Sequence, residues 1–253
     1  MTKTAIVTGG LAGLGLAIAR ALHEQGHRIV VGARRGGNPD QQKKAISTIG
    51  SNTTVGALDV RSETSVLQFC KAASTDAAPL ILVNAAGVTL HHTVTGHDLE
   101  DWNTVLDTNL TGPFLMTRAL LPGMIDAGWG RIVNIGSTAA HTAVADHPAY
   151  CASKSGLLGL SRAVALEGAP HGVTCATVSP TWVETDMLRR SAAQMAHTHG
   201  STPDQEIANL ASSNPQNRLV QPPEIAALVA FLCSDAAPAL TMEDIQVNAG
   251  AFW

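Results

Sequence analysis

Short runs of β-branched residues alternate with longer segments rich in alanine and leucine along the 253-residue chain. The runs show little alternation of polar and apolar residues, which is typical of strands covered on both faces of a sheet. Repeated strand–helix units predict a parallel sheet with right-handed crossovers. The predicted strands are residues 4–8, 28–32, 53–58, 80–84, 131–136, 173–178 and 245–247, and the predicted helices are about 13–25, 40–49, 63–74, 98–126, 149–168 and 223–234.

This order of elements predicts an α/β fold with a doubly wound, seven-stranded parallel sheet and helices on both faces, in three layers. We expect one domain over residues 1–253. Residues 181–221 contain no predicted strand and are rich in Ser, Thr, Asn, His and Gln. Long insertions in compact domains are usually lids or binding loops, so a substrate lid is favoured here over a solvent-exposed loop without a binding role.

Composition excludes several classes of protein. Hydrophobic residues make up 45% and charged residues 14%, which rules out wholesale disorder. A net charge of −4 and 4% aromatic residues argue against a nucleic-acid surface and a polybasic membrane patch. There is no apolar run of roughly 20 residues and no signal-peptide core, so we expect a cytoplasmic protein without a membrane partner. The cysteines fit no metal-binding pattern and are expected as free thiols: Cys70, Cys151, Cys175 and Cys233.

A glycine-rich segment follows the first predicted strand and opens the first predicted helix. Glycine permits positive φ and close approach of the backbone to a diphosphate, and a helix N-terminus offers free N–H groups to an anion. This strand–loop–helix context favours a dinucleotide site over a simple turn. The predicted contacts in the segment are Gly9, Leu11, Ala12, Gly13, Leu14 and Gly15.

The spacing Thr8-Gly9-x3-Gly13-x-Gly15 resembles the short-chain dehydrogenase/reductase family in its roughly 250-residue form. The resemblance covers nearly the whole chain and is closest to 3-oxoacyl-carrier-protein reductases. It implies a Rossmann-type fold and further cofactor contacts in three segments. These are Asp59 and Val60 at the adenine, then Asn84, Ala85, Ala86 and Gly87, and Pro180, Val183 and Thr185 on the nicotinamide side. The family usually has Pro-Gly where this chain has Pro180-Thr181.

The end of the second predicted strand bears on the choice of cofactor. An acidic residue there would bind both ribose hydroxyls and repel a 2′-phosphate. This chain instead has Arg34 and Arg35, and no carboxylate before Asp40. A guanidinium suits bidentate phosphate binding, and family members with Ala-Arg here tend to use NADP. We therefore predict NADP, with NAD possible if both arginines simply face solvent.

Tyr150 and Lys154 are four residues apart and would lie one turn apart on the same helix face. The ammonium group, together with the positive nicotinamide ring of an oxidised cofactor, favours the phenolate. Bringing a tyrosine pKa from about 10 to roughly 7 requires about 4 kcal/mol, which two close charges in a partly desolvated site could supply. Tyr150 is then a candidate general acid and base.

The family resemblance completes the predicted catalytic set. It implies that Ser137 holds the substrate oxygen and that Lys154 also binds the nicotinamide ribose. It further implies that Asn109 anchors a water linking Lys154 to solvent. Tyr150 would donate a proton to a ketone as hydride arrives, or accept one from an alcohol as hydride leaves.

Several of the ten histidines fall near this predicted site. Their scattered spacing does not form a helical two-histidine metal motif, and we predict no metal. Neutral loop histidines are one interpretation. The other is that His147, three residues before Tyr150, contacts a polar or anionic substrate, with Trp182 as an apolar wall.

Apolar positions in residues 98–126 and on the predicted Tyr150 helix could all face the sheet. Their excess also fits the family habit of pairing these two helices between subunits. We predict a homotetramer, with a dimer as the alternative. The apolar end Ala249-Gly250-Ala251-Phe252-Trp253 is expected to pack on a neighbouring subunit.

The sequence thus predicts an oxidoreductase that transfers hydride between NADP(H) and a small-molecule ketone or secondary alcohol. One alternative is an NAD-dependent dehydrogenase of a hydroxyacid, polyol or arylalkanol. Another is a dinucleotide-binding sensor without turnover, which would not need a positioned acid. A nucleotide-sugar epimerase or dehydratase shares the Tyr–Lys pair but usually has a longer substrate domain.

Overall fold

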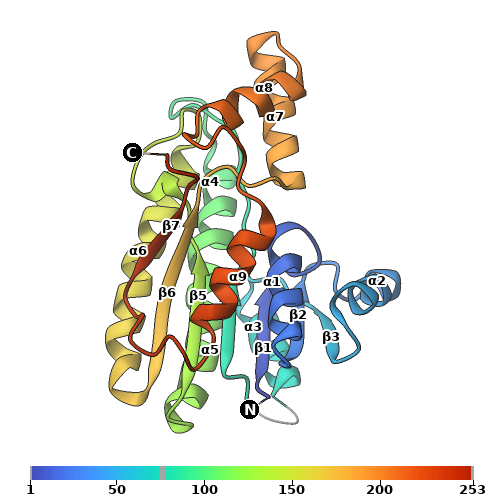
Figure 1. Ribbon diagram of the computed structural model, residues 1–253, viewed down its shortest axis with the longest axis vertical. Coiled ribbons are helices and arrows are strands. Elements are labelled where there is room, and N and C mark those ends of the chain that lie inside the picture. The colour runs from blue at the N-terminus through green and yellow to red at the C-terminus, as the bar shows by residue number, and fades with distance from the viewer. Residues whose placement is uncertain (1, 75–77, 252–253) are drawn as a thin grey trace.

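The computed structural model describes residues 2–74 and 78–251. Seven parallel strands form one sheet in the order β3-β2-β1-β4-β5-β6-β7, which confirms the predicted fold class (Figure 1). The strands are β1 (Thr4–Thr8), β2 (Arg28–Ala33), β3 (Thr53–Ala57), β4 (Ile81–Asn84), β5 (Gly130–Ile135), β6 (Val173–Pro180) and β7 (Asp244–Val247). The helices are α1 (Gly13–Glu24), α2 (Pro39–Ile49), α3 (Glu63–Ala73), α4 (Leu99–Leu106), α5 (Gly112–Asp126), α6 (Pro148–Gly168), α7 (Asp186–His199), α8 (Pro203–Ser212) and α9 (Pro222–Leu232).

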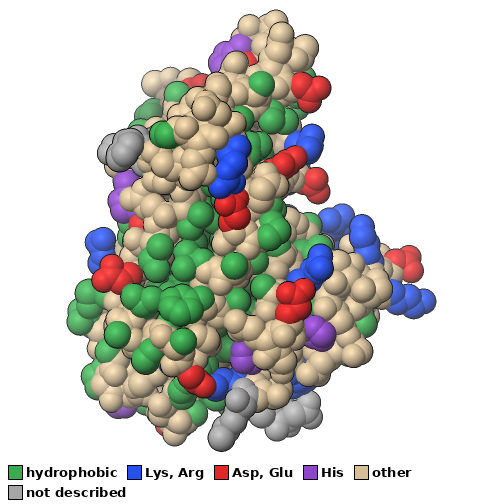
Figure 2. All heavy atoms as spheres, in the orientation of Figure 1, with side chains coloured by type: hydrophobic (Ala, Val, Ile, Leu, Met, Phe, Trp, Pro, Cys, Tyr) green, Lys and Arg blue, Asp and Glu red, His purple; other side chains and the backbone are tan. Residues whose placement is uncertain are grey.

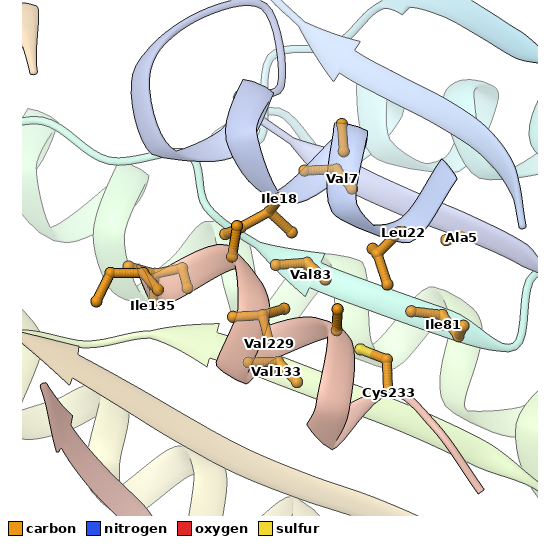
Figure 3. Packing of buried hydrophobic residues seen from close by; sticks show 14 of the residues in the cluster. Ala5, Val7, Ile18, Leu22, Ile81, Val83, Val133, Ile135, Val229 and Cys233 are labelled. Carbon is orange, nitrogen blue, oxygen red and sulfur yellow. The ribbon is translucent and has the colours of Figure 1, made fainter. Parts of the chain in front are cut away.

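The core has two halves because successive side chains of a strand point to opposite faces of the sheet. Val7 packs with helices α1, α2 and α9, whereas its neighbour Ile6 packs with α3, α5 and α6. Figure 3 shows the first half, where Ile18 and Leu22 of α1 and Val229 of α9 lie in one cluster with Val83 and Val133 of the strands. Burial of both faces explains why the strands are continuous apolar runs.

The long helix predicted over residues 98–126 is interrupted. Helices α4 and α5 are joined by a π-helical turn, Asp107–Thr111, which contains Asn109. Such a turn inserts one residue into the helical hydrogen-bond pattern and is frequent at functional sites. The periodicity of the apolar residues continues through the turn, so the sequence showed no boundary.

Residues 181–221 are more ordered than their polar composition indicated. They contain α7 and α8, which project past the carboxyl ends of the strands (Figure 1). Helix α8 begins at a capping box in which Thr202 and Gln205 each bond the other's backbone N–H. A bridge between Val183 and Val220 closes the base of the segment.

Four further findings bear on the sequence predictions. All four cysteines are free, with Cys70, Cys175 and Cys233 buried and Cys151 half-buried. Across residues 2–74 and 78–251, no helix combines the length and apolarity that a membrane crossing requires. No cluster of three or more His, Cys, Asp or Glu side chains in the same ranges could hold a metal ion. The predicted packing of Phe252 and Trp253 lies outside the described residues.

Candidate active site

The turn between β1 and α1 forms one end of the candidate site. Gly9 and Gly13 have φ of 71° and 52°, and a Cβ on Gly9 would lie 2.9 Å from the Ala86 Cα. Helix α1 begins at Gly13 after Ala12, which has no side-chain cap, and its first turn contains no acidic residue. Its first N–H groups and its partial positive charge are therefore available to an anion such as a diphosphate.

The β1 turn is bonded to the segment that follows β4. The Thr8 hydroxyl oxygen accepts hydrogen bonds from the backbone N–H groups of Ala85 and Ala86, at 3.1 and 3.0 Å. Asn84 is buried beneath them and donates a hydrogen bond of 2.8 Å to Asn134 of β5. Asn84 therefore supports the sheet, and the backbone of residues 85–87 forms the surface above it.

A cleft of about 390 Å³ extends from the α1 turn across the carboxyl ends of the strands to α7. Two hydroxyls that line it, on Thr89 and Thr181, are buried with no hydrogen-bond partner among the described residues. Unpartnered buried hydroxyls cost free energy that a polar ligand can recover. The predicted site residues that line the cleft are Gly9, Ala12, Gly13, Leu14, Gly15, Arg35, Ala85, Ala86, Gly87, Ser137, His147, Tyr150, Lys154, Pro180, Trp182, Val183 and Thr185.

Other predicted site residues lie outside this lining. Leu11 packs against the core, Asn84 and Asn109 are buried, and Val60 lies 2.8 Å from where a Cβ on Gly112 would stand. Arg34 is exposed beside the cleft rather than within it. Figure 2 shows Lys and Arg side chains gathered near the β2–α2 side of the molecule.

Asp59, predicted to bind adenine, forms a two-point ion pair with Arg61. Arg61 Nη2 and Nε donate to the two carboxylate oxygens at 2.8 and 3.0 Å. The Arg61 hydrogen bonds hold the pKa of Asp59 below its ordinary value, and the nearby positive charge of Arg34 acts in the same direction. The Asp59 carboxylate therefore already has a strong partner, which the sequence pattern did not reveal.

The structure brings Ser137, Tyr150 and Lys154 together. Pro148 occupies the first turn of α6, which is where proline is tolerated in a helix, and Tyr150 and Lys154 follow on its first two turns. Lys154 Nζ lies 5.6 Å from the centroid of the Tyr150 ring, and the Ser137 side chain is near enough to Tyr150 to influence the pKa of its phenol. Ser137 itself is held by the Ala139 N–H, which donates to its oxygen at 3.1 Å.

The electrostatics of this trio differ from the predicted lowering of the tyrosine pKa. Burial raises the pKa of the Tyr150 phenol above its ordinary value, and the hydrogen bond with Ser137 opposes that effect only in part. Burial also lowers the pKa of Lys154 to about 8, while its ammonium donates to the Ile135 carbonyl at 2.7 Å. In the protein by itself Tyr150 is thus the neutral acid at pH 7.

Asn109 ties the π-helical turn to both sides of the site. Its side chain accepts a hydrogen bond from the Val88 N–H and donates to the Val88 carbonyl, both at 2.9 Å. It also donates to Ser153 at 3.1 Å, and Ser153 donates to the Tyr150 carbonyl at 2.8 Å. The side-chain amide is therefore occupied by protein partners, so an anchored water would have to bond the main chain.

His147 is part of an internal hydrogen-bonded chain that reaches α7. Its Nδ1 lies 2.6 Å from the Ala145 carbonyl and must be the donor, which leaves Nε2 as an acceptor in the neutral ring. His91 Nε2 lies 3.2 Å from that nitrogen and 3.2 Å from the hydroxyl of Ser191. Burial lowers the pKa of both rings, to about 4 for His91.

Both nitrogens of His147 are therefore engaged within the protein, which leaves it poorly suited to bind an anionic substrate. Sequence reasoning missed Ser191 and its neighbours Leu188 and Arg190, which also line the cleft. They belong to α7, whose polar composition indicated a loop. Its N-cap Thr185, whose hydroxyl accepts from the Leu188 N–H at 3.3 Å, was the available signal for a helix.

The match to the family model described as short chain dehydrogenase extends over residues 3–196. The chain belongs to this family. D-beta-hydroxybutyrate dehydrogenase of Cupriavidus necator is 36% identical, with 93% of this chain and 92% of that relative covered. The 3-oxoacyl-[acyl-carrier-protein] reductase FabG of Vibrio cholerae is also 36% identical, with 99% and 97% covered. The crystal structure of a single-residue variant of actinorhodin polyketide ketoreductase with NADPH superposes with a TM-score of 0.93 at 32% identity, covering 98% and 97% of the two chains.

Membership confirms the resemblance inferred from the motifs. It also confirms the prediction of an oxidoreductase acting on alcohol or keto groups, since these short-chain dehydrogenase relatives are named as reductases and dehydrogenases.

Proposed function

We propose that this protein is an NADP(H)-dependent ketoreductase acting on 3-oxoacyl thioesters. The observation that supports this most strongly is the grouping of Ser137, Tyr150 and Lys154 in the lining of a cleft whose other end is the uncapped start of α1. A half-buried acid, a hydroxyl beside it and an anion site in one cleft are what reduction of a carbonyl requires. Two of the relatives described above are named as ketone reductases.

The cleft suits the diphosphate and nicotinamide parts of a dinucleotide. The glycine turn and the start of α1 would hold the diphosphate, with Arg34 and Arg35 near the 2′-phosphate. Lys154 would bind the nicotinamide ribose, and Pro180, Val183 and Thr185 would line the nicotinamide side. When bound, NADPH supplies the hydride.

The protein's own residues manage the proton. Tyr150 donates its hydroxyl proton to the substrate oxygen, which Ser137 holds by a hydrogen bond. The phenolate that remains lies beside the Lys154 ammonium, which stabilises it and can return a proton because its pKa is about 8. Asn109 keeps the Val88 loop and the Tyr150 turn in register during these steps.

An assay of reduced-cofactor absorbance tests the function. We expect NADPH to be consumed with a 3-oxobutanoyl thioester of N-acetylcysteamine, with a 3-hydroxyacyl product. Turnover confined to NAD⁺ and free 3-hydroxybutyrate would instead establish the dehydrogenase alternative, for which a relative of that name exists. Tight dinucleotide binding without turnover of any ketone or alcohol would establish the sensor alternative.

Arg34→Asp tests the cofactor preference. Replacing the guanidinium by a carboxylate removes the phosphate partner and repels a 2′-phosphate, so the ratio of kcat/KM for NADPH over NADH is expected to fall about 10- to 100-fold. Steady-state kinetics with both cofactors measure the ratio. Lys44→Asp on the exposed face of α2 makes the same charge change and should leave it within about twofold. An unchanged ratio in Arg34→Asp would remove the phosphate role.

Within the single domain that we propose for residues 1–253, residues 181–221 act as a substrate lid. Helices α7 and α8 are joined through the Glu206 carboxylate of α8, which is hydrogen bonded to His199 at the end of α7 and to Ser201 between the two helices. Near the site, α7 is connected to the rest of the protein by the Ser191 hydroxyl, which is hydrogen bonded to His91, and His91 is in turn hydrogen bonded to His147. His91 and His147 therefore position α7 over the cleft.

Ser191→Ala cuts that connection while leaving the other residues that line the cleft in place. We expect KM for the ketone to rise about 5- to 10-fold, corresponding to one lost hydrogen bond, with the NADPH dissociation constant unchanged. The exposed Ser212→Ala on α8 is the matched control and should change neither quantity. A parallel loss of cofactor affinity would show that Ser191 serves the fold rather than the lid.

We also propose a homotetramer, on narrower grounds than the sequence indicated. Large apolar side chains remain exposed on all three of the helices α4, α5 and α6: Leu99 is 71%, Phe114 42% and Leu166 66% exposed. Large exposed apolar side chains on neighbouring helices favour a subunit interface. Sedimentation equilibrium measures the assembly, and a monomer at every concentration would refute it.

A further inference from the structure

A second cavity of about 580 Å³ adjoins the candidate active site. It shares two wall residues, Val144 and Trp182, with the cleft that contains Tyr150. Its other walls come from the loop before α6, the segment after α8 and the end of the described chain: Ala143, Ala145, Ser213, Asn214, Pro215 and Ala251. The cavity therefore continues the cleft past Trp182, on the side away from α1.

Among the residues that the structure describes, no charged side chain lines this cavity. Asn214 is 2% exposed and uses its amide to donate to the Arg218 carbonyl at 2.8 Å. The surface offered to a ligand is consequently alanine, valine, proline and tryptophan, with one serine. Such a surface favours an apolar group and offers no counter-charge to a carboxylate or phosphate.

The walls are braced by contacts between distant segments. The Gln216 N–H donates to the Ala249 carbonyl at 3.2 Å, and Pro215 lies against Gly250, 3.2 Å from where a Cβ on that glycine would stand. Within the end of the described chain, Asn248 donates to the Ala251 carbonyl at 2.6 Å. The segment after α8 and the end of the described chain are therefore held against each other by the protein itself.

We propose that this cavity is a subsite for the acyl tail of a medium- to long-chain 3-oxoacyl thioester. The inference rests on the proposed function. A 3-oxoacyl thioester has two arms at the carbonyl that is reduced, one an apolar alkyl chain and the other a polar thioester. The alkyl arm fits the uncharged cavity beyond Trp182. The thioester arm leaves along α7, where Arg190 lines the cleft.

A chain-length series tests the subsite. Each methylene that enters an apolar cavity is expected to raise kcat/KM about fourfold, equivalent to about 0.8 kcal/mol, until the cavity is filled. The probes are N-acetylcysteamine thioesters from 3-oxobutanoyl to 3-oxododecanoyl, assayed with NADPH. We expect kcat/KM to rise along the series and then level off.

Ala143→Trp assigns the effect to this cavity, because Ala143 lines the cavity and is not among the residues that line the cleft. The added indole should abolish the gain for long chains and leave the 3-oxobutanoyl substrate within about twofold. Ala127→Trp, at the exposed carboxyl end of α5, adds the same side chain elsewhere and should preserve the full series. Equal losses for short and long substrates in Ala143→Trp would overturn the assignment.

Three further outcomes are decisive. A chain-length dependence that appears only after deletion of Phe252 and Trp253 would show that the chain's own end competes for the cavity, and it would overturn the proposal. Reduction of the 3-oxobutanoyl substrate with no gain along the series would overturn the subsite alone. Failure with every member of the series would refute the proposed function, and the subsite with it.

Discussion

Tyr150→Phe is expected to lose at least about 1000-fold in kcat while binding NADPH as the native protein does. The substitution removes the hydroxyl that gives the proton in the proposed mechanism, and general acid catalysis contributes about 10²- to 10⁴-fold. Ser137 keeps its bond from the Ala139 N–H, so the rest of the trio stays in place. Stopped-flow single turnover and fluorescence titration of NADPH measure the two quantities.

The same residue allows a direct test of the electrostatics, because Tyr150 is the single tyrosine among the 253 residues. Its ultraviolet titration curve therefore reports one phenol. We expect a midpoint above the ordinary tyrosine pKa in the protein alone, as burial demands, and a lower midpoint with NADP⁺ bound. Full activity in Tyr150→Phe would show that Tyr150 is not the general acid, regardless of the pKa that the titration gives.

Lys154→Met is expected to abolish turnover and yet stabilise the protein at pH 7. Burial lowers the Lys154 pKa from 10.5 to about 8, so holding the ammonium in the fold costs about 3 kcal/mol. Methionine removes that cost but leaves the Ile135 carbonyl without its donor, which offsets about 1 kcal/mol. The net expectation is a free energy of unfolding about 2 kcal/mol higher, measured by urea denaturation at fixed protein concentration.

The pH dependence separates this effect from simple repacking. Between about pH 8 and 10.5 the unfolded chain binds more protons at Lys154 than the folded chain, so the native protein gains stability as pH rises. The advantage of Lys154→Met should therefore shrink across this window. Lys71→Met on the exposed side of α3 is the control and should show no such trend. A constant difference between native protein and Lys154→Met would contradict the buried-charge account.

Local patterns in the sequence were sufficient for the fold and for part of the site. The strands and most helices follow from the apolar periodicity, because a strand buried on both faces has to be apolar throughout. The glycine turn and the Tyr150–Lys154 spacing are also local, since a turn conformation and one helical turn are set within a few residues. The structure places the glycine turn and the Tyr150–Lys154 pair in the lining of one cleft.

Contacts between distant segments were decided only by the tertiary structure. The contact between His91 and Ser191 joins residues 100 positions apart in the sequence. The hydrogen bonds of the Asn109 side chain with Val88 and Ser153 depend on how α6 packs beside the π-helical turn. The direction of the Tyr150 pKa shift follows from burial, which spacing does not report. Local chemistry can be recognised from neighbouring residues, whereas burial and cross-chain hydrogen bonds exist only once the layers have packed.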